Sequence, residues 1–168
     1  MVPFYIQLSF KNISNNSFEL PITMQIPTII LLTLLFDRKV VFKAFTIYII
    51  LGLFIFPVFH QGGSIGYLLT PNFGYLLGIF PIIIIIDKLN KRNKIKISDF
   101  LIKGFLAISS LHLTGITYNF IQIILYNKYN IFFYNLGKYS FGKIGYHFLI
   151  LCPLLLLIKP IELLKRSK

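Results

Sequence analysis

Long apolar stretches alternate with short polar connections along this chain of 168 residues. A helix needs roughly 20 predominantly apolar residues to cross about 30 Å of hydrocarbon. Stretches with few or no charged residues approach or reach that length five times. They occupy residues 20–36, 44–60, 64–86, 104–126 and 144–158. The pattern therefore predicts an all-α polytopic membrane bundle, with a single transmembrane domain over residues 1–168.

The start of the chain departs from this pattern. Residues 1–10 are apolar but cover only about half a span, and residues 11–19 form a polar connection. We therefore expect a short or partial first helix in addition to five full spans. The segment has no basic region followed by an apolar core, so no cleavable signal peptide is expected.

Prolines set the expected helix boundaries. The first full span is expected to begin near Pro21, where proline is tolerated, and to be kinked by Pro27 in its interior. Thr70 followed by Pro71 is typical of a helix start. The four later spans are expected at residues 40–56, 71–87, 100–126 and 144–164.

The composition excludes a soluble domain with a polar exterior. Hydrophobic residues make up 56% of the chain, the mean hydropathy is +0.76 and only five residues are acidic. The net charge of +12 comes from Lys and Arg in the short connections, not from a stripe that could follow phosphates, so nucleic acid is not an expected partner. The single cysteine, Cys152, lies in an apolar stretch, so no disulfide framework is expected.

The distribution of basic residues predicts an orientation. Of the 17 Lys and Arg residues, 13 fall in the connections on one side of the predicted spans and four on the other. By the positive-inside rule, the richer side faces the cytoplasm or its equivalent. The C-terminus is therefore expected on the cytoplasmic or stromal side of a bacterial or plastid membrane, and residues 60–66 on the opposite side.

The Gly/Pro-rich segment at residues 56–80 is unusual for a membrane protein. It has no charged residue, yet it contains five glycines and the polar sequence His60-Gln61-Gly62-Gly63-Ser64. In hydrocarbon, irregular backbone is tolerated only where protein covers it or where it lines a cavity. The segment therefore indicates a pocket for a small molecule.

The residue types in this segment suit a carboxylate ligand. Gly62, Gly63 and Gly66 allow successive N–H groups to converge on an anion, and the helix that begins at Pro71 directs its N-terminus to the same surface. His60, Gln61, Ser64 and Asn72 add hydrogen-bonding groups, while Tyr67, Phe73, Gly74 and Tyr75 are expected to form a wall. The alternative is that the glycines and prolines only form a tight re-entry turn.

Other polar residues have structural interpretations that compete with functional ones. Gln25 could face the same pocket, or it could form a hydrogen bond between helices. The polar side chains Ser109, His112, Thr117 and Asn119 favour interhelical contacts, and His147 is expected at the membrane interface. The three histidines lack metal-ligand spacing, so neither a metal nor a cofactor is expected.

No catalytic chemistry is indicated. The acids Glu19, Asp37, Asp87, Asp99 and Glu162 all lie near span ends, whereas a proton relay needs an acid within the membrane. We therefore predict a protein that is not an enzyme. The polybasic residues 88–96 could contact anionic membrane lipids or an acidic partner, although charge that only sets the topology is the simpler interpretation.

An ordered set of motifs is similar to one family. It comprises PITMQIP at residues 21–27, Tyr48 followed by GLFIFPVF at residues 52–59, and HQGGSIGYLLTPNFGYLLGIF at residues 60–80. The set resembles the BioY family, most closely its cyanobacterial or plastid-like branch. The resemblance implies a six-helix membrane subunit that captures biotin or a similar vitamin, with an ATPase pair and a transmembrane coupling subunit as partners. It assigns Gln25, residues 62–66 and residues 72–75 to the pocket.

The chain also departs from that family at charged positions. Members commonly carry an arginine where this chain has Leu76, and an Asp-x-x-Lys motif where it has Ile158 and Ile161. The small-residue spacing that docks the coupling subunit is absent from residues 1–10. An alternative function is therefore a membrane scaffold or assembly protein, derived from such a subunit, that has lost ligand binding. A proton-coupled carrier or membrane enzyme is a third possibility.

Overall fold

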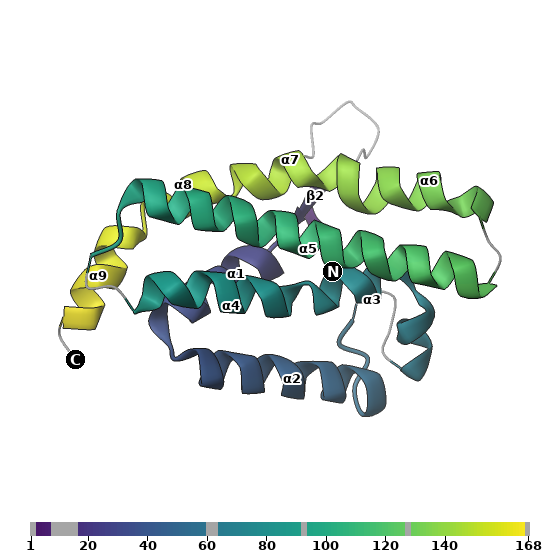
Figure 1. Ribbon diagram of the computed structural model, residues 1–168, viewed down its shortest axis with the longest axis horizontal. Helices are drawn as coiled ribbons and strands as arrows, with labels where there is room; N and C mark the ends of the chain where they lie inside the picture. Colours follow the sequence, from purple (N-terminus) through teal and green to yellow (C-terminus); the bar gives the residue numbers. More distant parts are fainter. Residues whose placement is uncertain (1–2, 8–16, 60–63, 92–93, 127–128, 167–168) are drawn as a thin grey trace.

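The protein is a bundle of helices packed nearly side by side (Figure 1). This confirms the predicted helical membrane fold class. The computed structural model describes residues 3–7, 17–59, 64–91, 94–126 and 129–166. The α-helices are α1 (Gln25–Leu35), α2 (Arg38–Phe54), α3 (Pro71–Leu77), α4 (Ile79–Asn90), α5 (Ile97–Tyr126), α6 (Phe132–Leu136), α7 (Gly142–Leu149), α8 (Leu151–Leu155) and α9 (Ile158–Arg166). The other helical elements are the 3₁₀-helices η1 (Ile65–Leu69) and η2 (Tyr129–Ile131) and the π-helix η3 (Gly137–Phe141).

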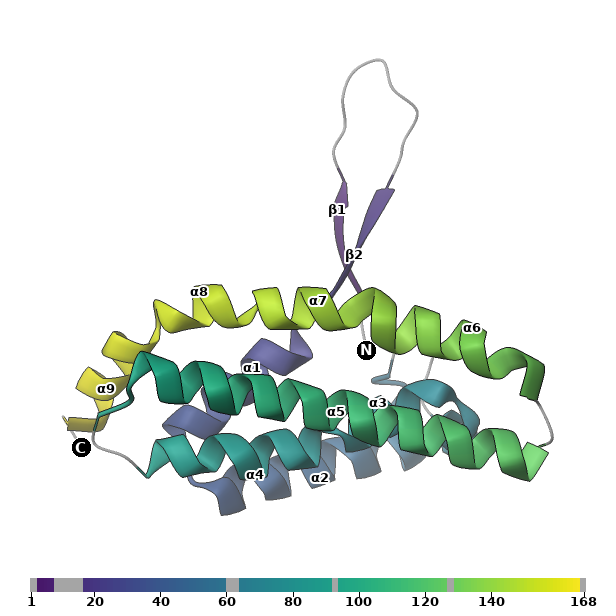
Figure 2. The ribbon, with the colours of Figure 1, turned by 45° about the horizontal axis from the view of Figure 1, so that its top comes forward.

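The chain begins with a β-hairpin. Strands β1 (Pro3–Gln7) and β2 (Ser17–Thr23) pair antiparallel, and Figure 2 shows the hairpin leaving the bundle across the direction of the helices, beside α7. The predicted short first helix is therefore wrong. In β2 the apolar residues Phe18, Leu20 and Ile22 alternate with Glu19, Pro21 and Thr23, which is the period of a strand and not of a helix.

The predicted kink at Pro27 is also wrong. Because β2 continues to Thr23, the first full helix begins only at Gln25, and Pro27 therefore lies in its first turn. Backbone N–H groups in a first turn have no partner within the helix, so proline removes nothing there. Helix α1 has 11 residues, fewer than the expected span.

The start of α3 agrees with the sequence. Pro71 is its first residue, and Thr70 precedes it in an extended conformation. The Thr70 hydroxyl donates a hydrogen bond to the Tyr67 carbonyl (2.8 Å) and does not cap the helix. Helices α3 and α4 together form a stretch of 20 residues, Pro71–Asn90.

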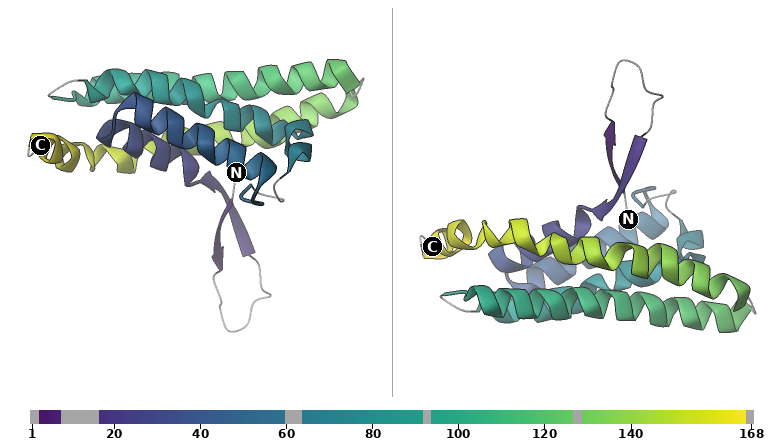
Figure 3. Two further views of the ribbon diagram at one scale, coloured as in Figure 1. Left: turned by 90° about the horizontal axis from the view of Figure 1, so that it is seen from below. Right: turned by 90° about the horizontal axis from the view of Figure 1, so that it is seen from above.

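Two helices in the described part of the chain are long and apolar enough to cross a membrane: Pro71–Asn90 and the 30-residue α5. The elements α6, η3, α7 and α8 then follow one another from Phe132 to Leu155. The last helical region therefore begins earlier than the predicted Ile144. The predicted end at Leu164 falls in α9, which bends away from α8 (Figure 1) and lies at the C-terminal end of the bundle (Figure 3).

The two groups of connections lie at opposite ends of the bundle. The α1–α2 and α4–α5 connections and α9 occupy one end, while η1 and the α5–α6 connection occupy the other (Figure 1). At the first end, the Asn90 side chain donates to the Phe36 carbonyl (2.9 Å), and the Ile95 N–H donates to the Glu162 carboxylate. The basic connections are thus held together on the side away from η1.

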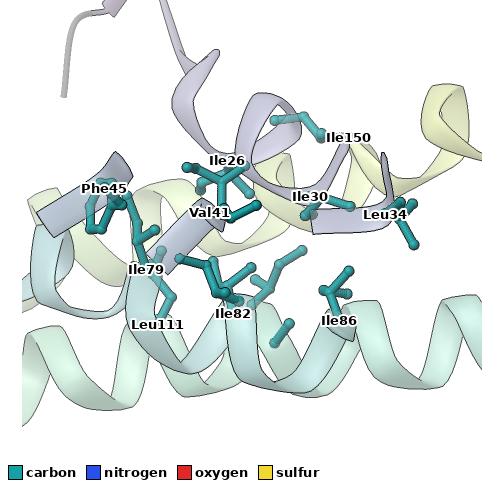
Figure 4. Close-up of a cluster of buried hydrophobic side chains, with 14 of the residues drawn as sticks. Ile26, Ile30, Leu34, Val41, Phe45, Ile79, Ile82, Ile86, Leu111 and Ile150 are labelled. Atoms are coloured by element: carbon teal, nitrogen blue, oxygen red, sulfur yellow. The ribbon is translucent and has the colours of Figure 1, made fainter. Parts of the chain in front are cut away.

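The core lies where α1, α4 and α5 meet. Isoleucines and leucines from the three helices interdigitate there (Figure 4). Helices α3 and α4 approach α5 closely because both sides carry glycines: a Cβ on Gly74 would collide with Tyr118, and one on Gly115 would collide with Tyr75. A Cβ on Gly78 would lie 2.8 Å from the Leu111 carbonyl oxygen. Small residues at such contacts are what allow membrane helices to pack backbone to backbone.

We expect Gly78→Ala to lower the free energy of unfolding in detergent by about 1–3 kcal/mol. The added methyl collides with the backbone of Leu111, which cannot move away as a flexible side chain can. Gly145→Ala is the matched control, since a Cβ there meets nothing within 4 Å. Thermal unfolding of both purified variants checks this. Equal melting temperatures for the two variants would contradict the proposed tight contact.

Candidate binding site

The Gly/Pro-rich segment is only partly described. Residues 60–63, which include the predicted site residues His60, Gln61, Gly62 and Gly63, lie outside the described residues. Ser64 has φ 146° and ψ 171°, a conformation that glycine adopts readily and that strains serine. Gly66 and Ser64 are both exposed. Strained backbone of this kind is concentrated at binding sites.

Helix α5 attaches the second half of this segment. The Tyr118 hydroxyl and the Gln122 amide both donate to the carbonyl oxygen of Leu68 in η1, the latter at 3.0 Å. Tyr118 and Gln122 are one helical turn apart, so they reach the same oxygen from one face of α5. This contact fixes η1 against the bundle.

Tyr67 points inward from η1. It is 5% exposed, and its ring stacks on Phe59 with 4.6 Å between centroids, while Phe59 in turn meets Tyr48 edge-on. Burial, reinforced by the hydroxyls of Tyr48 and Tyr139, raises the pKa of Tyr67 to about 12. The Tyr67 hydroxyl is therefore protonated at neutral pH. It has no hydrogen-bond partner among the described residues.

Gln25 is the first residue of α1 and joins two helices. Its Nε2 donates a hydrogen bond to the Tyr48 hydroxyl of α2 (3.0 Å), so the interhelical interpretation is correct. Its Oε1 is buried and has no partner in the described part of the chain. The Nε2 atom of Gln25 thus joins the two helices, and its Oε1 atom remains available to a ligand.

The remaining predicted residues lie in the first turns of α3. Asn72, Gly74 and Tyr75 are all buried, and Tyr75 is packed against Gly115 of α5. The Tyr75 ring lies 5.9 Å from that of His112. The Tyr75 hydroxyl approaches Ser140 without completing a hydrogen bond.

Two histidines and a serine form a hydrogen-bonded chain beside Tyr75. The Ser140 hydroxyl lies 2.9 Å from Nδ1 of His112, whose Nε2 lies 3.0 Å from Nδ1 of His147. The interhelical role predicted for His112 is therefore confirmed. His147, predicted at the membrane interface, is instead 0% exposed and contacts His112 near the middle of the 30-residue α5. Ser140 belongs to the π-helix η3, and such irregular turns occur frequently at functional sites.

Asn119 is a further buried residue of α5, two turns beyond His112. It accepts a hydrogen bond from Asn135 (3.3 Å), and its own Nδ2 has no partner within the described ranges. Thr117, expected on the same polar face, is instead exposed and donates to the Leu113 carbonyl. The spacing of seven residues between His112 and Asn119 was the usable signal for their shared face.

Buried polar atoms without partners mark the interior as a candidate site. In the part of the chain that the structure describes, the unpaired atoms are Gln25 Oε1, Tyr67 OH, Tyr75 OH, Asn119 Nδ2 and His147 Nε2. Each such atom costs about 1–3 kcal/mol if it stays unpaired. A ligand or water that met them would recover this free energy. We call the group formed by Gln25, Tyr48, Tyr67, Tyr75, His112, Ser140 and His147 the polar interior.

A groove of about 510 Å³ opens between α1 and α2. Its volume is within the range of roughly 300–1,000 Å³ that is usual for small-molecule sites. Most of its wall is apolar and no charged side chain lines it, but Gln25 and Tyr48 form part of the wall. The groove thus adjoins the polar interior at this pair, and the rest of its wall suits hydrocarbon.

Sequence reasoning missed several residues of this arrangement. Tyr139 and Ser140 were not singled out, because a π-helix changes the register and no periodicity predicts it. The contact of Tyr48 with Gln25 was not predicted because the two residues are 23 positions apart in the sequence. Among the described residues, no three His, Cys, Asp or Glu side chains lie close enough together to hold a metal ion.

The fold and the site define an integral membrane protein with a helical bundle and an interior lined by neutral hydrogen-bonding groups. The chain belongs to the BioY family, whose sequence profile matches residues 2–143. It is similar to a protein of Lysinibacillus sphaericus named "Probable biotin transporter BioY", with 29% identity over 107 residues, which are 61% of this chain and 53% of that protein. The chain therefore spans about half the length of this curated relative. No solved structure matches it.

We expect Tyr48→Phe and Gln25→Leu each to lower the free energy of unfolding by about 0.5–1.5 kcal/mol, because each removes a hydrogen bond between two half-buried side chains. The double variant should lose less than the sum of the two, since neither group then lacks a partner. Tyr126→Phe, at an exposed tyrosine, is the control and should change stability little. Additive losses in thermal unfolding would show that the two side chains do not interact.

Proposed function

We propose that this protein captures biotin as the membrane-embedded, substrate-binding subunit of a transporter and catalyses no reaction itself. The observation that carries the proposal is the set of unpaired polar atoms in the interior of a BioY-family bundle. Biotin combines a cyclic urea, which donates and accepts hydrogen bonds, with an apolar ring and a carboxylate chain. A site with neutral hydrogen-bonding groups and aromatic walls suits the first two parts.

The carboxylate is assigned to the Gly/Pro-rich segment. The glycines Gly62, Gly63 and Gly66 allow backbone N–H groups to converge on an anion, and the helix Pro71–Asn90 begins nearby. The site on this proposal comprises His60, Gln61, Ser64, Tyr67, Asn72, Gly74, Tyr75 and Gln25 in addition to those glycines. The strain at Ser64 supports a functional rather than a purely connecting role.

Energy for uptake is proposed to come from partner proteins. The sequence contains no Gly-rich nucleotide-binding loop, so an ATPase pair acting through a transmembrane coupling subunit is the expected source. Asp87, a buried acid at the end of α4, forms an ion pair with Lys91 at 3.4 Å instead of facing the polar interior. We place the protein in a bacterial or plastid membrane with its C-terminus on the cytoplasmic or stromal side.

We expect the purified, detergent-solubilised protein to bind labelled biotin at equilibrium, and biotin amide to compete poorly, because the amide removes the charge that the glycine segment is expected to hold. Binding by biotin and its amide with equal affinity would contradict the carboxylate assignment. Absence of biotin binding by well-folded protein would instead favour the scaffold or assembly function.

The variant Gly63→Val should lose biotin binding while it remains folded and inserted in the membrane, because the branched side chain blocks close approach of the backbone to the carboxylate. Gly145→Val is the matched control, at a glycine with open space around it. Equilibrium binding and gel filtration of both variants check this. Unchanged binding by Gly63→Val would remove the glycine segment from the site.

A further inference from the structure

The Ser140–His112–His147 chain ends in an unused atom. His112 is 2% exposed, Ser140 2% and His147 0%, so water does not surround the three side chains. Both ring nitrogens of His112 have partners: Nδ1 meets Ser140 and Nε2 meets His147. His147 makes this contact through its own Nδ1. Nε2 of His147 is then the single ring nitrogen of the pair that has no partner in the described residues.

The direction of this hydrogen-bonded chain can reverse. If His112 donates from Nε2 to Nδ1 of His147, the proton of neutral His147 must lie on its Nε2, which becomes a donor. If His147 donates from Nδ1, its Nε2 becomes an acceptor, and His112 donates from Nδ1 to the Ser140 oxygen. Both arrangements keep the two internal hydrogen bonds. The free nitrogen can therefore meet either a donor or an acceptor without any change in packing.

The chain is connected to the candidate site. The Tyr75 ring lies 5.9 Å from that of His112 and 6.2 Å from that of Tyr139, so Tyr75 joins the hydrogen-bonded chain to α3. The nearest cations of the neighbouring turns, Lys138 and Lys143, lie over the Tyr139 ring at 5.5 and 6.0 Å from its centroid. No acid is paired with either histidine among the described contacts, so the hydrogen-bonded chain offers no ion-pair partner to a cationic ligand group.

We propose that Nε2 of His147 is the specificity-determining contact for the neutral head of the ligand, a cyclic urea or a group of the same hydrogen-bonding chemistry. This inference rests on the proposed function. A urea presents N–H donors and a carbonyl acceptor side by side, and an amphoteric nitrogen can pair with either. Ser140 and His112 are positioning residues that set which proton His147 carries.

Two substitutions separate this role from a structural one. In His147→Asn, the short amide can still reach His112 but not the Nε2 position. In His147→Gln, the longer amide replaces Nε2 but not Nδ1. We expect His147→Asn to weaken biotin binding about tenfold or more, the usual effect of leaving a buried ligand group unpaired. We expect His147→Gln to retain the larger share of affinity, whereas a purely structural role predicts the opposite order.

A second measurement needs no functional variant. The chain has three histidines, so selective ¹⁵N labelling gives only three imidazoles in the NMR spectrum. The Nε2 resonance of His147 is identified by its absence from the spectrum of His147→Gln. Adding biotin, or desthiobiotin, which keeps the urea, should shift this resonance. Lipoic acid, which has a similar carboxylate chain but no urea, should not shift it.

The outcomes distinguish the two proposals. If the unmodified protein binds no biotin, the proposed function fails, and this inference fails with it. If the unmodified protein binds biotin but its Nε2 resonance does not move, or if His147→Asn binds as tightly as the unmodified protein, only the role of His147 is overturned. Gel filtration of each variant ensures that loss of binding is not loss of folding.

Discussion

The close approach of α5 to the helix Pro71–Asn90 is the contact on which the rest of the structure depends. Gly74, Gly78 and Gly115 allow it, because side chains at these positions would collide with Tyr118, Leu111 and Tyr75. Hydrocarbon gives helices no hydrophobic reason to associate, so dispersion contacts at short range must supply the attraction. The same contact presses Tyr75 against α5 beside His112. The same glycines thus determine both the packing of the helices and the position of Tyr75 in the polar interior.

A site without charge has definite consequences for selectivity. The polar interior consists of amide, hydroxyl and imidazole groups, so a charged ligand group there would carry a large desolvation cost without an ion-pair partner among these seven residues. Discrimination must therefore come from matching donors to acceptors. A site that hydrogen-bonds a ligand rejects an analogue that lacks the group much more strongly than a purely apolar pocket can.

The parts of the structure that were predictable are those with local causes. The helix start at Pro71 follows from the fixed φ of proline, and the separation of basic connections follows from span length and charge. The kink at Pro27 was wrongly predicted because the effect of this proline depends on where the helix begins, and the pairing of β2 with β1 in a hairpin decided that. His147 was misplaced because burial of a histidine depends on its partners. His112 lies 35 residues from His147 in the sequence, and no local sequence pattern predicts their contact.

The attachment of η1 to α5 restricts how this short helix can move. Tyr118 and Gln122 donate to the same carbonyl oxygen of Leu68. Loss of either hydrogen bond leaves the other in place, and η1 stays attached to α5. After the end of α2, Phe59 is buried, and its ring links α2 to η1 because it meets Tyr48 edge-on and stacks on Tyr67. To move away from the bundle, η1 would have to lose both hydrogen bonds to α5 and the aromatic contact with Phe59, so this short helix behaves as a fixed wall and not as a hinge.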